Sequence, residues 1–179
     1  SIALDAGDVV FQFASLSFDM SVMDYFMSLC HGATLHLWRG DSWLDELKAS
    51  GATYVEITPS ALALVDPADG VKLRCVVSSG EPLPLQTGLR WSRRGVRMLN
   101  PMGPSECTVH TTSGEVMSSA TAVTIGQPMT NMRVLMLMRQ TLMYVSFVLK
   151  YQNTFPSTFR SLSEHFPITF RSLFRSLFR

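Results

Sequence analysis

A short loop that places a hydroxyl beside a carboxylate, Leu99–Thr112 (LNPMGPSECTVHTT), is the part of this chain best suited to chemistry. Gly103 and Pro104 predict a tight turn, because glycine tolerates backbone angles that other residues avoid and proline fixes its own. Ser105 and Glu106 follow the turn directly. Such oxygen ligands suit Mg²⁺, which takes one or two protein ligands and leaves its other positions to water and phosphate. The loop therefore indicates a site for a nucleotide and its metal; the alternative is an ordinary surface turn.

Three further segments accompany this loop. They are Phe13–Phe26 (FASLSFDMSVMDYF), Val76–Pro84 (VVSSGEPLP) and Ile125–Asn131 (IGQPMTN). In order and spacing the four segments resemble the adenylation domains of nonribosomal peptide synthetases, within the wider family of acyl-CoA synthetases and luciferases. In that family they read approximately FDxS, a loop containing Gly-Glu, NxYGPTE and IGxPxxN. The resemblance covers residues 3–137 and implies a partial large subdomain of the adenylate-forming enzyme fold.

The elements that must position these segments alternate between strands and helices. Such alternation predicts an α/β fold, with a mostly parallel sheet and flanking helices. Strands are expected at 9–16, 33–38, 53–57, 73–77 and 96–99, with a further candidate at 108–112. A first helix is expected to begin at Ser21, which would cap it, and to end at Gly32. Further helices are expected over 42–49, 58–65 and 85–93.

The candidate residues follow the ends of expected strands. Asp19 comes after the first strand, Gly80 and Glu81 after the strand at 73–77, and 100–106 after the strand at 96–99. Ligands of parallel α/β sheets bind beyond the carboxyl ends of the strands. The chain order and the sheet geometry therefore predict a single cleft.

Composition and charge divide the chain into two parts. Its 179 residues are 46% hydrophobic, enough for a core, and only 16% charged. Residues 1–138 contain 9 Lys and Arg against 13 Asp and Glu, a net charge of −4, whereas 139–179 contain 6 against 1, a net charge of +5. We therefore expect a partial adenylation domain over 1–137 and a poorly ordered tail outside the family over 138–179.

The tail carries an internal repeat. FPSTFRSL at 155–162 recurs as FPITFRSL at 166–173, and FRSL recurs at 174–177. A proline in each unit and the lack of an acidic face are not typical of a continuous packed helix. We therefore interpret the tail as translated sequence from outside the family. The alternatives are a tail that binds nucleic acid and a basic segment that lies on a membrane surface. Arg139 and Gln140 interrupt the apolar run at 134–149, so we expect no membrane span there. We also expect no nucleic-acid partner.

The cysteines and the N-terminus indicate a reducing compartment. Cys30, Cys75 and Cys107 are scattered and odd in number, which favours buried free thiols over a disulfide framework or a zinc site. The chain has no initial Met and no signal-peptide pattern, so we expect a cytoplasmic protein whose sequence begins within a domain.

The resemblance implies roles for individual residues. Asp19 matches the aspartate that pairs with the α-amino group of the substrate; the alternative is that it caps the following helix. Ser105 and Glu106 match catalytic positions, and Glu106 is also the implied Mg²⁺ ligand. The implied nucleotide-binding residues are Gly80, Glu81, Pro82, Asn100, Met102 and Gly103. Met102 stands where the family has tyrosine, so a flat surface for adenine is lost.

The substrate pocket implied by the resemblance is mixed in polarity. Its residues are Asp19, Met20, Met23, Glu56, Val77, Ser79, Pro101, Val109 and His110. Glu56 would favour a ligand with a hydrogen-bond donor or a cation, provided that it does not face solvent at a strand edge. We expect Asp24, by contrast, to be a solvated helix residue.

The implied reaction joins ATP and an amino acid to form an aminoacyl adenylate, with Mg²⁺. Carrier and condensation domains are the implied partners in an intact synthetase, and phosphopantetheine belongs to the carrier domain. The Gly-rich phosphate loop, the Tyr-x-x-Gly-Asp block and the C-terminal lid with its lysine do not occur in this sequence. We therefore expect this chain to be inactive alone. The alternatives are a non-enzymatic remnant and a piece of another adenylate-forming ligase, such as an acyl-CoA synthetase, although Asp19 argues against a fatty acid.

Overall fold

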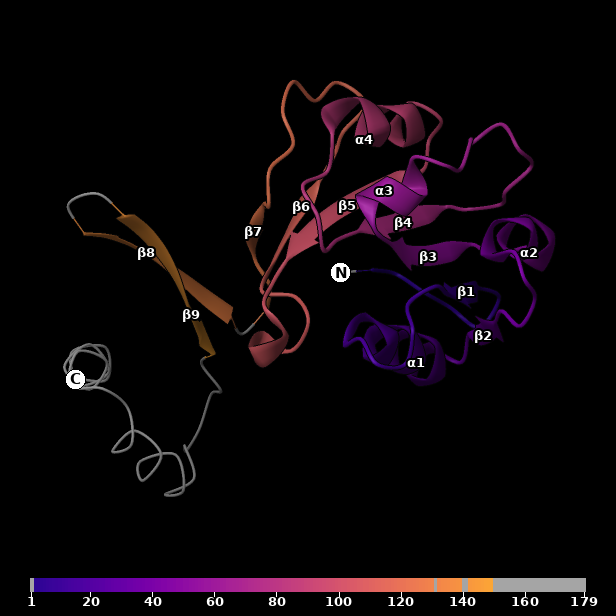
Figure 1. The fold of residues 1–179 in the computed structure, drawn as a ribbon, viewed down its shortest axis with the longest axis horizontal. Coiled ribbons are helices and arrows are strands. Elements are labelled where there is room, and N and C mark those ends of the chain that lie inside the picture. Colours follow the sequence, from indigo (N-terminus) through magenta and orange to yellow (C-terminus); the bar gives the residue numbers. More distant parts are fainter. Residues whose placement is uncertain (1, 131, 140–141, 150–179) are drawn as a thin grey trace, which may run out of the picture. The chain divides into compact units, whose positions relative to one another are not determined.

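Seven strands form one sheet in the computed structural model, which describes residues 2–130, 132–139 and 142–149 (Figure 1). The strand order is β2-β1-β3-β4-β5-β6-β7. Their bounds are β1 Val9–Gln12, β2 Thr34–Leu37, β3 Tyr54–Ile57, β4 Cys75–Ser78, β5 Arg97–Met102, β6 Thr112–Glu115 and β7 Gln127–Pro128. The pairs from β2 to β5 are parallel, and β6 and β7 join antiparallel. The predicted mostly parallel α/β sheet is confirmed.

Four helices lie between these strands: α1 Met20–His31, α2 Trp43–Ser50, α3 Pro59–Leu62 and α4 Leu85–Ser92. Gly32 and Gly51 end α1 and α2 in the left-handed conformation, both with φ 68°, which glycine adopts without steric penalty. The Thr58 hydroxyl accepts the Ala61 N–H at the start of α3. These helix ends agree with the prediction.

Two expected boundaries near the first helix are wrong. The strand expected over 9–16 ends at Gln12, because residues 15–18 form a turn closed by the Phe18 N–H and the Ser15 carbonyl (2.9 Å). Ser21 does not cap α1, which begins one residue earlier; its hydroxyl donates to the Phe18 carbonyl instead (2.7 Å).

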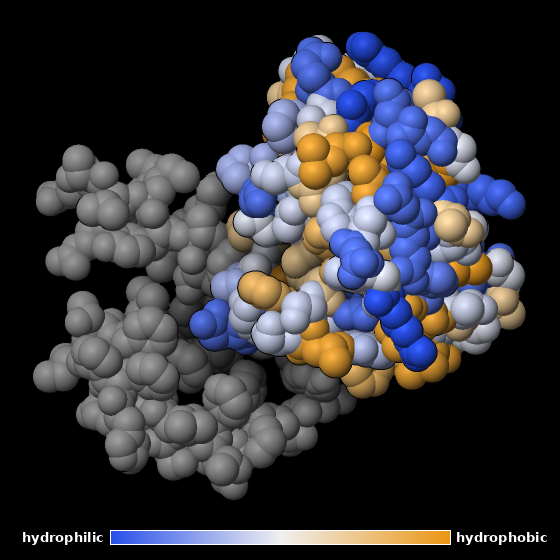
Figure 2. Space-filling model, turned by 45° about the vertical axis from the view of Figure 1, so that its right-hand side comes forward, coloured by the Kyte–Doolittle hydropathy of each residue, from blue (hydrophilic) through white to orange (hydrophobic). Residues whose placement is uncertain are grey.

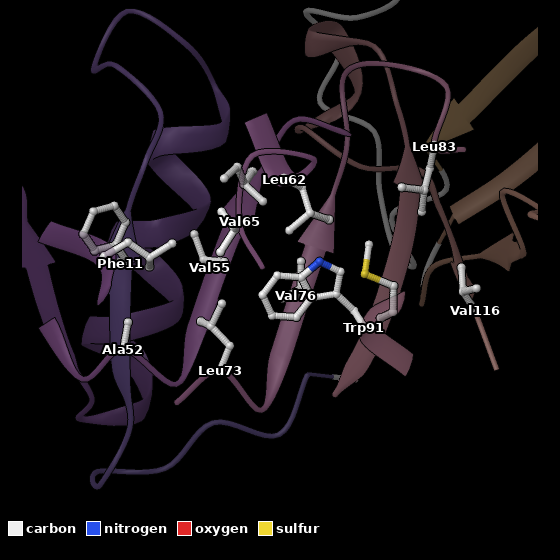
Figure 3. Packing of buried hydrophobic residues seen from close by; sticks show 13 residues of the cluster. Phe11, Ala52, Val55, Leu62, Val65, Leu73, Val76, Leu83, Trp91 and Val116 are labelled. Carbon is white, nitrogen blue, oxygen red and sulfur yellow. The ribbon is translucent and has the colours of Figure 1, made fainter. Parts of the chain in front are cut away.

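The core consists of two hydrophobic clusters on the two faces of the sheet. The larger cluster packs Leu47 of α2, Leu62 of α3 and Trp91 of α4 against alternate residues of the central strands. Figure 3 shows the indole of Trp91 in the middle of this cluster. The smaller cluster, on the α1 face, includes Tyr54 and Val77.

Helix α1 turns its polar face to the sheet. Ser21, Asp24 and Ser28 are its buried residues. Phe26 and Leu29 are 65% and 70% exposed. Figure 2 shows that apolar patches lie among the hydrophilic residues on one face of the molecule. Val22, Phe26 and Leu29 stand at helical spacing in the sequence and so predict a helix, but all three are exposed and do not form the face that packs on the sheet.

The residues after β7 form a separate two-stranded sheet of β8 (Met132–Arg139) and β9 (Leu142–Leu149). The apolar run at 134–149 is therefore largely strand. Within the described residues no helix is long and apolar enough to cross a membrane. One compact unit of the chain spans Ser1–Val148. The repeats at 155–177 lie outside the described residues, and the division at 137 stays a prediction.

An ion pair between the buried Asp8 and the exposed Arg74 fastens the start of the chain to the sheet. Asp8, which is 4% exposed, accepts hydrogen bonds from Arg74 Nε (2.6 Å), Arg74 Nη2 and the Thr53 hydroxyl (2.7 Å). Hydrogen bonding to the Arg74 guanidinium, the largest contribution, holds the pKa of the Asp8 carboxyl well below its usual range. Asp8 thus joins the residues before β1 to those before β3 and β4.

Replacing Asp8 with asparagine should lower the free energy of unfolding at pH 7 by about 1–3 kcal/mol, because a charge-assisted hydrogen-bond network is lost. A depressed carboxyl pKa stabilises the fold above the unfolded-state pKa, near 4, and this contribution disappears as the pH falls further. Urea unfolding at pH 7 and pH 3 should therefore show a smaller difference between wild type and Asp8→Asn at pH 3. The exposed Asp41→Asn is the control, and an equal difference at both pH values would contradict the role of the charge.

Candidate functional site

A cleft of about 780 Å³ lies at the carboxyl ends of the parallel strands. Its walls come from the segment between β1 and α1, the loop after β4, the end of β5 and the turn before β6. These are the places where the chain leaves the sheet, as the rule for parallel sheets predicts. The single cleft predicted from the sequence is present.

Most of the predicted site residues border this cleft. They are Asp19, Met20, Ser79, Gly80, Glu81, Pro82, Asn100, Pro101, Met102, Gly103, Ser105, Val109 and His110. Four do not: Met23 is half-buried on α1, Val77 is buried in the α1-side cluster, Glu56 lies behind the cleft, and Glu106 is exposed. Sequence reasoning did not single out Phe13, Phe18 or Thr58, which also line the cleft.

Asp19 offers an unused carboxylate at the wall of the cleft. It is half-buried and directly precedes α1, but its side chain makes no capping hydrogen bond, so the capping alternative is wrong. Among the residues that the structure describes, no side chain or backbone N–H pairs with this carboxylate. A ligand that enters the cleft would find it free to accept a hydrogen bond.

Glu56 is fully buried on β3, which lies between β1 and β4. The alternative of a solvent-facing residue at a strand edge is therefore wrong. Its Oε1 accepts the Ser79 hydroxyl (3.0 Å) and lies 2.9 Å from His110 Nε2, at ion-pair distance but without hydrogen-bond alignment. Ser79 and His110 both border the cleft, so one buried carboxylate lies directly behind two of its wall residues.

Asp24 is a second buried acid on the same face of the sheet, and the expectation of a solvated residue is wrong. It is 0% exposed, and neither of its carboxyl oxygens has a hydrogen-bond partner within the described part of the chain. Burial, with a further contribution from the charge of Glu56, raises the pKa of Asp24 to about 9. Asp24 therefore keeps its proton at neutral pH. The available sequence signal was its spacing from Ser21 and Ser28, which share its helix face.

A strained turn brings His110 to Glu56. Thr108 and Val109 have φ values of 61° and 68°, in the left-handed region that β-branched residues rarely adopt. The His110 N–H donates to the Thr108 carbonyl (2.8 Å), and the Thr111 N–H donates to the Met102 carbonyl (2.9 Å). The strand expected over 108–112 is therefore wrong except at Thr112, where β6 begins.

Gly103 fits against the backbone of this turn. A Cβ atom at Gly103 would lie 2.6 Å from the Val109 carbonyl oxygen and 2.7 Å from the Thr111 nitrogen. Backbone atoms cannot move aside as the end of a side chain can. Glycine is therefore needed here for close approach between the end of β5 and the turn.

Two predicted nucleotide-binding residues hold the rim of the cleft together. Glu81 accepts hydrogen bonds from the backbone N–H (3.1 Å) and the hydroxyl of Ser60. The Asn100 amide donates to the Thr124 carbonyl (3.0 Å), which ties β5 to the segment before β7. Both side chains therefore make hydrogen bonds that support the loops bordering the cleft.

The described residues contain no group of three or more His, Cys, Asp or Glu side chains that could hold a metal by themselves. Glu106 lies exposed next to Ser105 in the short 3₁₀ helix η1 (Ser105–Cys107). One accessible carboxylate suits Mg²⁺ that is shared with phosphate, since this ion keeps most of its ligands as water and phosphate. It does not suit a metal bound by protein ligands alone.

Comparison with known proteins supplies the family. The AMP-binding enzyme family matches residues 1–147. This chain belongs to that family. The chain is 37% identical over 122 residues to the nonribosomal peptide synthetase inpB of Emericella nidulans. The aligned residues make up 65% of this chain and 5% of inpB. It is also 34% identical over 132 residues to the nonribosomal peptide synthetase verP of Clonostachys rogersoniana. These residues make up 73% of this chain and 6% of verP.

Solved structures of this family have the same fold. The AMPPNP-bound form of the synthetase FmoA3 matches with a TM-score of 0.66 and 25% identity, over 77% of this chain and 17% of FmoA3. PA1221, which contains adenylation and PCP domains, matches with a TM-score of 0.68 and 23% identity, over 76% of this chain and 26% of PA1221. The AMP-binding chain described here thus spans a small part of its relatives and has the fold of a piece of an adenylation domain.

Proposed function

We propose that this chain is the central part of an adenylation domain that activates an amino acid with ATP. In this reaction a carboxylate oxygen of the amino acid forms a bond to the α-phosphorus of ATP, and the bond between that phosphorus and the bridging oxygen breaks to release pyrophosphate. The product is an aminoacyl adenylate. The match to the AMP-binding family and the synthetase relatives support this reaction class.

The free carboxylate of Asp19 is the observation that carries the choice of an amino acid. A half-buried carboxylate without a partner is poorly solvated, and a cationic group of the ligand would compensate for this. The α-ammonium of an amino acid is such a group, whereas a fatty acid has none. This favours amino-acid activation over the acyl-CoA synthetase alternative.

The remaining cleft residues would bind the nucleotide and orient the reacting groups. Gly80 and Pro82 border the cleft beside Asn100 and Met102, on the side where adenine would lie. Glu106 would hold Mg²⁺ together with phosphate, and the ion would neutralise phosphate charge. Ser105 borders the same space with its hydroxyl. Catalysis of this kind depends mainly on position and charge.

The intact protein would pass its product to neighbouring domains. The relatives are many times longer than this chain, and one structural neighbour contains a PCP domain. We therefore propose a carrier domain with phosphopantetheine, and a condensation domain, as partners in a cytoplasmic synthetase.

The test uses two non-hydrolysable adenylate analogues with the full chain. Norleucyl sulfamoyl adenosine should bind about ten- to a hundredfold more tightly than hexanoyl sulfamoyl adenosine, which differs only in lacking the α-amino group. Asp19→Asn should abolish this difference, whereas Asp41→Asn, which changes an exposed aspartate, should keep it. Isothermal titration calorimetry measures all six affinities. If neither analogue binds, or if Asp19→Asn weakens both equally, the proposed role is wrong.

A further inference from the structure

The wall formed by His110 and Ser79 is backed by the Glu56 carboxylate, of which one oxygen has no hydrogen-bond partner within the described residues. Glu56 Oε1 is close to both side chains, but Glu56 Oε2 is buried and has no hydrogen-bond partner within the described residues. The same residues supply no lysine or arginine as an ion-pair partner for Glu56. A buried carboxylate with so few donors is unfavourable unless another donor or a cation approaches it.

The charge around Glu56 is unbalanced. Asp24 and the Tyr54 hydroxyl are two further buried polar groups on this face, and their side-chain oxygens also lack partners in the described part of the chain. Because Asp24 keeps its proton, it adds no second negative charge but also no countercharge. His110 is the ionisable neighbour on the cleft side, and it makes no aligned hydrogen bond to Glu56.

The approach to this carboxylate is apolar. Met20 and Val109 border the cleft, and the Met20 sulfur lies 3.7 Å from the Ser79 hydroxyl oxygen that bonds Glu56. Methylene groups would pack on these side chains. A wall that is apolar along its length and acidic behind its end complements a flexible alkyl chain that ends in a cation.

Resting on the proposed function, we infer that this cleft selects an amino acid whose side chain ends in a basic nitrogen, with Glu56 as the residue that determines this specificity behind Ser79 and His110. The α-amino group would pair with Asp19, and the side-chain ammonium would lie against His110 and Ser79. At that position it is separated from Glu56 by one layer of side chains, away from bulk water. Attraction between charges is strong in such surroundings.

Three adenylate analogues of similar reach test this inference with the full chain. Ornithyl sulfamoyl adenosine carries a side-chain ammonium, norleucyl sulfamoyl adenosine carries a methyl group in its place, and glutaminyl sulfamoyl adenosine carries a neutral donor. We expect the ornithyl compound to bind about ten- to a hundredfold more tightly than the other two. Calorimetric titration at pH 7 measures the three affinities.

Two substitutions locate the origin of the preference. Glu56→Gln should bring the three affinities to within about threefold of one another, because it removes the charge and keeps the side-chain shape. Asp24→Asn changes a buried carboxyl that does not border the cleft and is already neutral, so it should keep the preference. Circular dichroism of each variant reports whether it folds.

Each outcome decides a different claim. If the ornithyl and norleucyl compounds bind equally to the wild-type chain, the specificity is wrong while the proposed adenylate site stands. If the glutaminyl compound binds as tightly as the ornithyl compound, selection for a cation is wrong. If none of the three binds, the proposed function fails and this inference fails with it. If Glu56→Gln does not fold, the three affinities of the wild-type chain still decide whether the cleft selects a basic side chain.

Discussion

At pH 7 the Asp24→Asn variant should be more stable than the wild-type chain by about 4 kcal/mol, because asparagine needs no proton to remain neutral. Asp24 is fully buried, and its pKa of about 9 in the folded protein compares with 3.8 for an ordinary aspartate. Between these two values the folded chain binds one proton more than the unfolded chain. Stability therefore falls as the pH rises, by about 1.4 kcal/mol for each pH unit in this interval.

Urea unfolding of both proteins at pH 5 and pH 8 measures this effect. The advantage of Asp24→Asn should be about 4 kcal/mol larger at pH 8 than at pH 5, since three pH units separate the two conditions. Asp45→Asn, an exposed substitution on α2, is the matched control and should show little such change. An advantage that does not depend on pH would mean that Asp24 does not hold its proton in the folded chain.

Replacing Trp91 with alanine should lower the free energy of unfolding by about 3–5 kcal/mol. The side chain is 0% exposed, and Figure 3 shows it in the middle of the larger cluster, near Leu62 and Val76. Alanine would leave a cavity between α4 and the sheet. A domain of this size has only about 5–15 kcal/mol of stability, so much of it would be lost.

Trp91→Phe is the matched control for this substitution. Phenylalanine keeps an aromatic ring in the cluster. The indole Nε1 has no hydrogen-bond partner within the described residues, so the substitution breaks no hydrogen bond among them. Its loss of stability in urea unfolding should be clearly smaller than that of Trp91→Ala. Equal losses would show that the volume of the side chain is not what stabilises this cluster.

The arrangement of the cleft was predictable because it follows from local signals and one rule of sheet geometry. Alternating strands and helices predicted a parallel sheet, and Gly32 and Gly51 correctly marked helix ends. Once the strands are parallel, the segments that follow them meet at one edge. For this reason Asp19, Gly80 and Ser105 could be predicted to lie together although 86 positions separate the first from the last.

Burial of the two acids could not be predicted in the same way. A single carboxylate in α1 or β3 looks like a surface residue, because charged groups rarely lie inside a fold without a partner. Asp24 is buried because α1 turns its serine face to the sheet, and Glu56 is buried because β3 has neighbours on both sides. Both facts depend on contacts distant in sequence. The turn at Thr108 and Val109 was missed because β-branched residues favour strands, and tertiary contacts override that preference here.

The strand order has a consequence for the synthesis of this protein. β1 lies between β2 and β3, and its contact with β3 requires residues made about 40 positions later. At about 5–20 residues per second, a ribosome leaves one edge of β1 unpaired for a few seconds. The cleft needs the turn near residue 110 as well, so its walls meet only when most of the sheet has left the ribosome. Such long-range pairing folds slowly, and strand edges that stay unpaired during synthesis favour aggregation of the nascent chain.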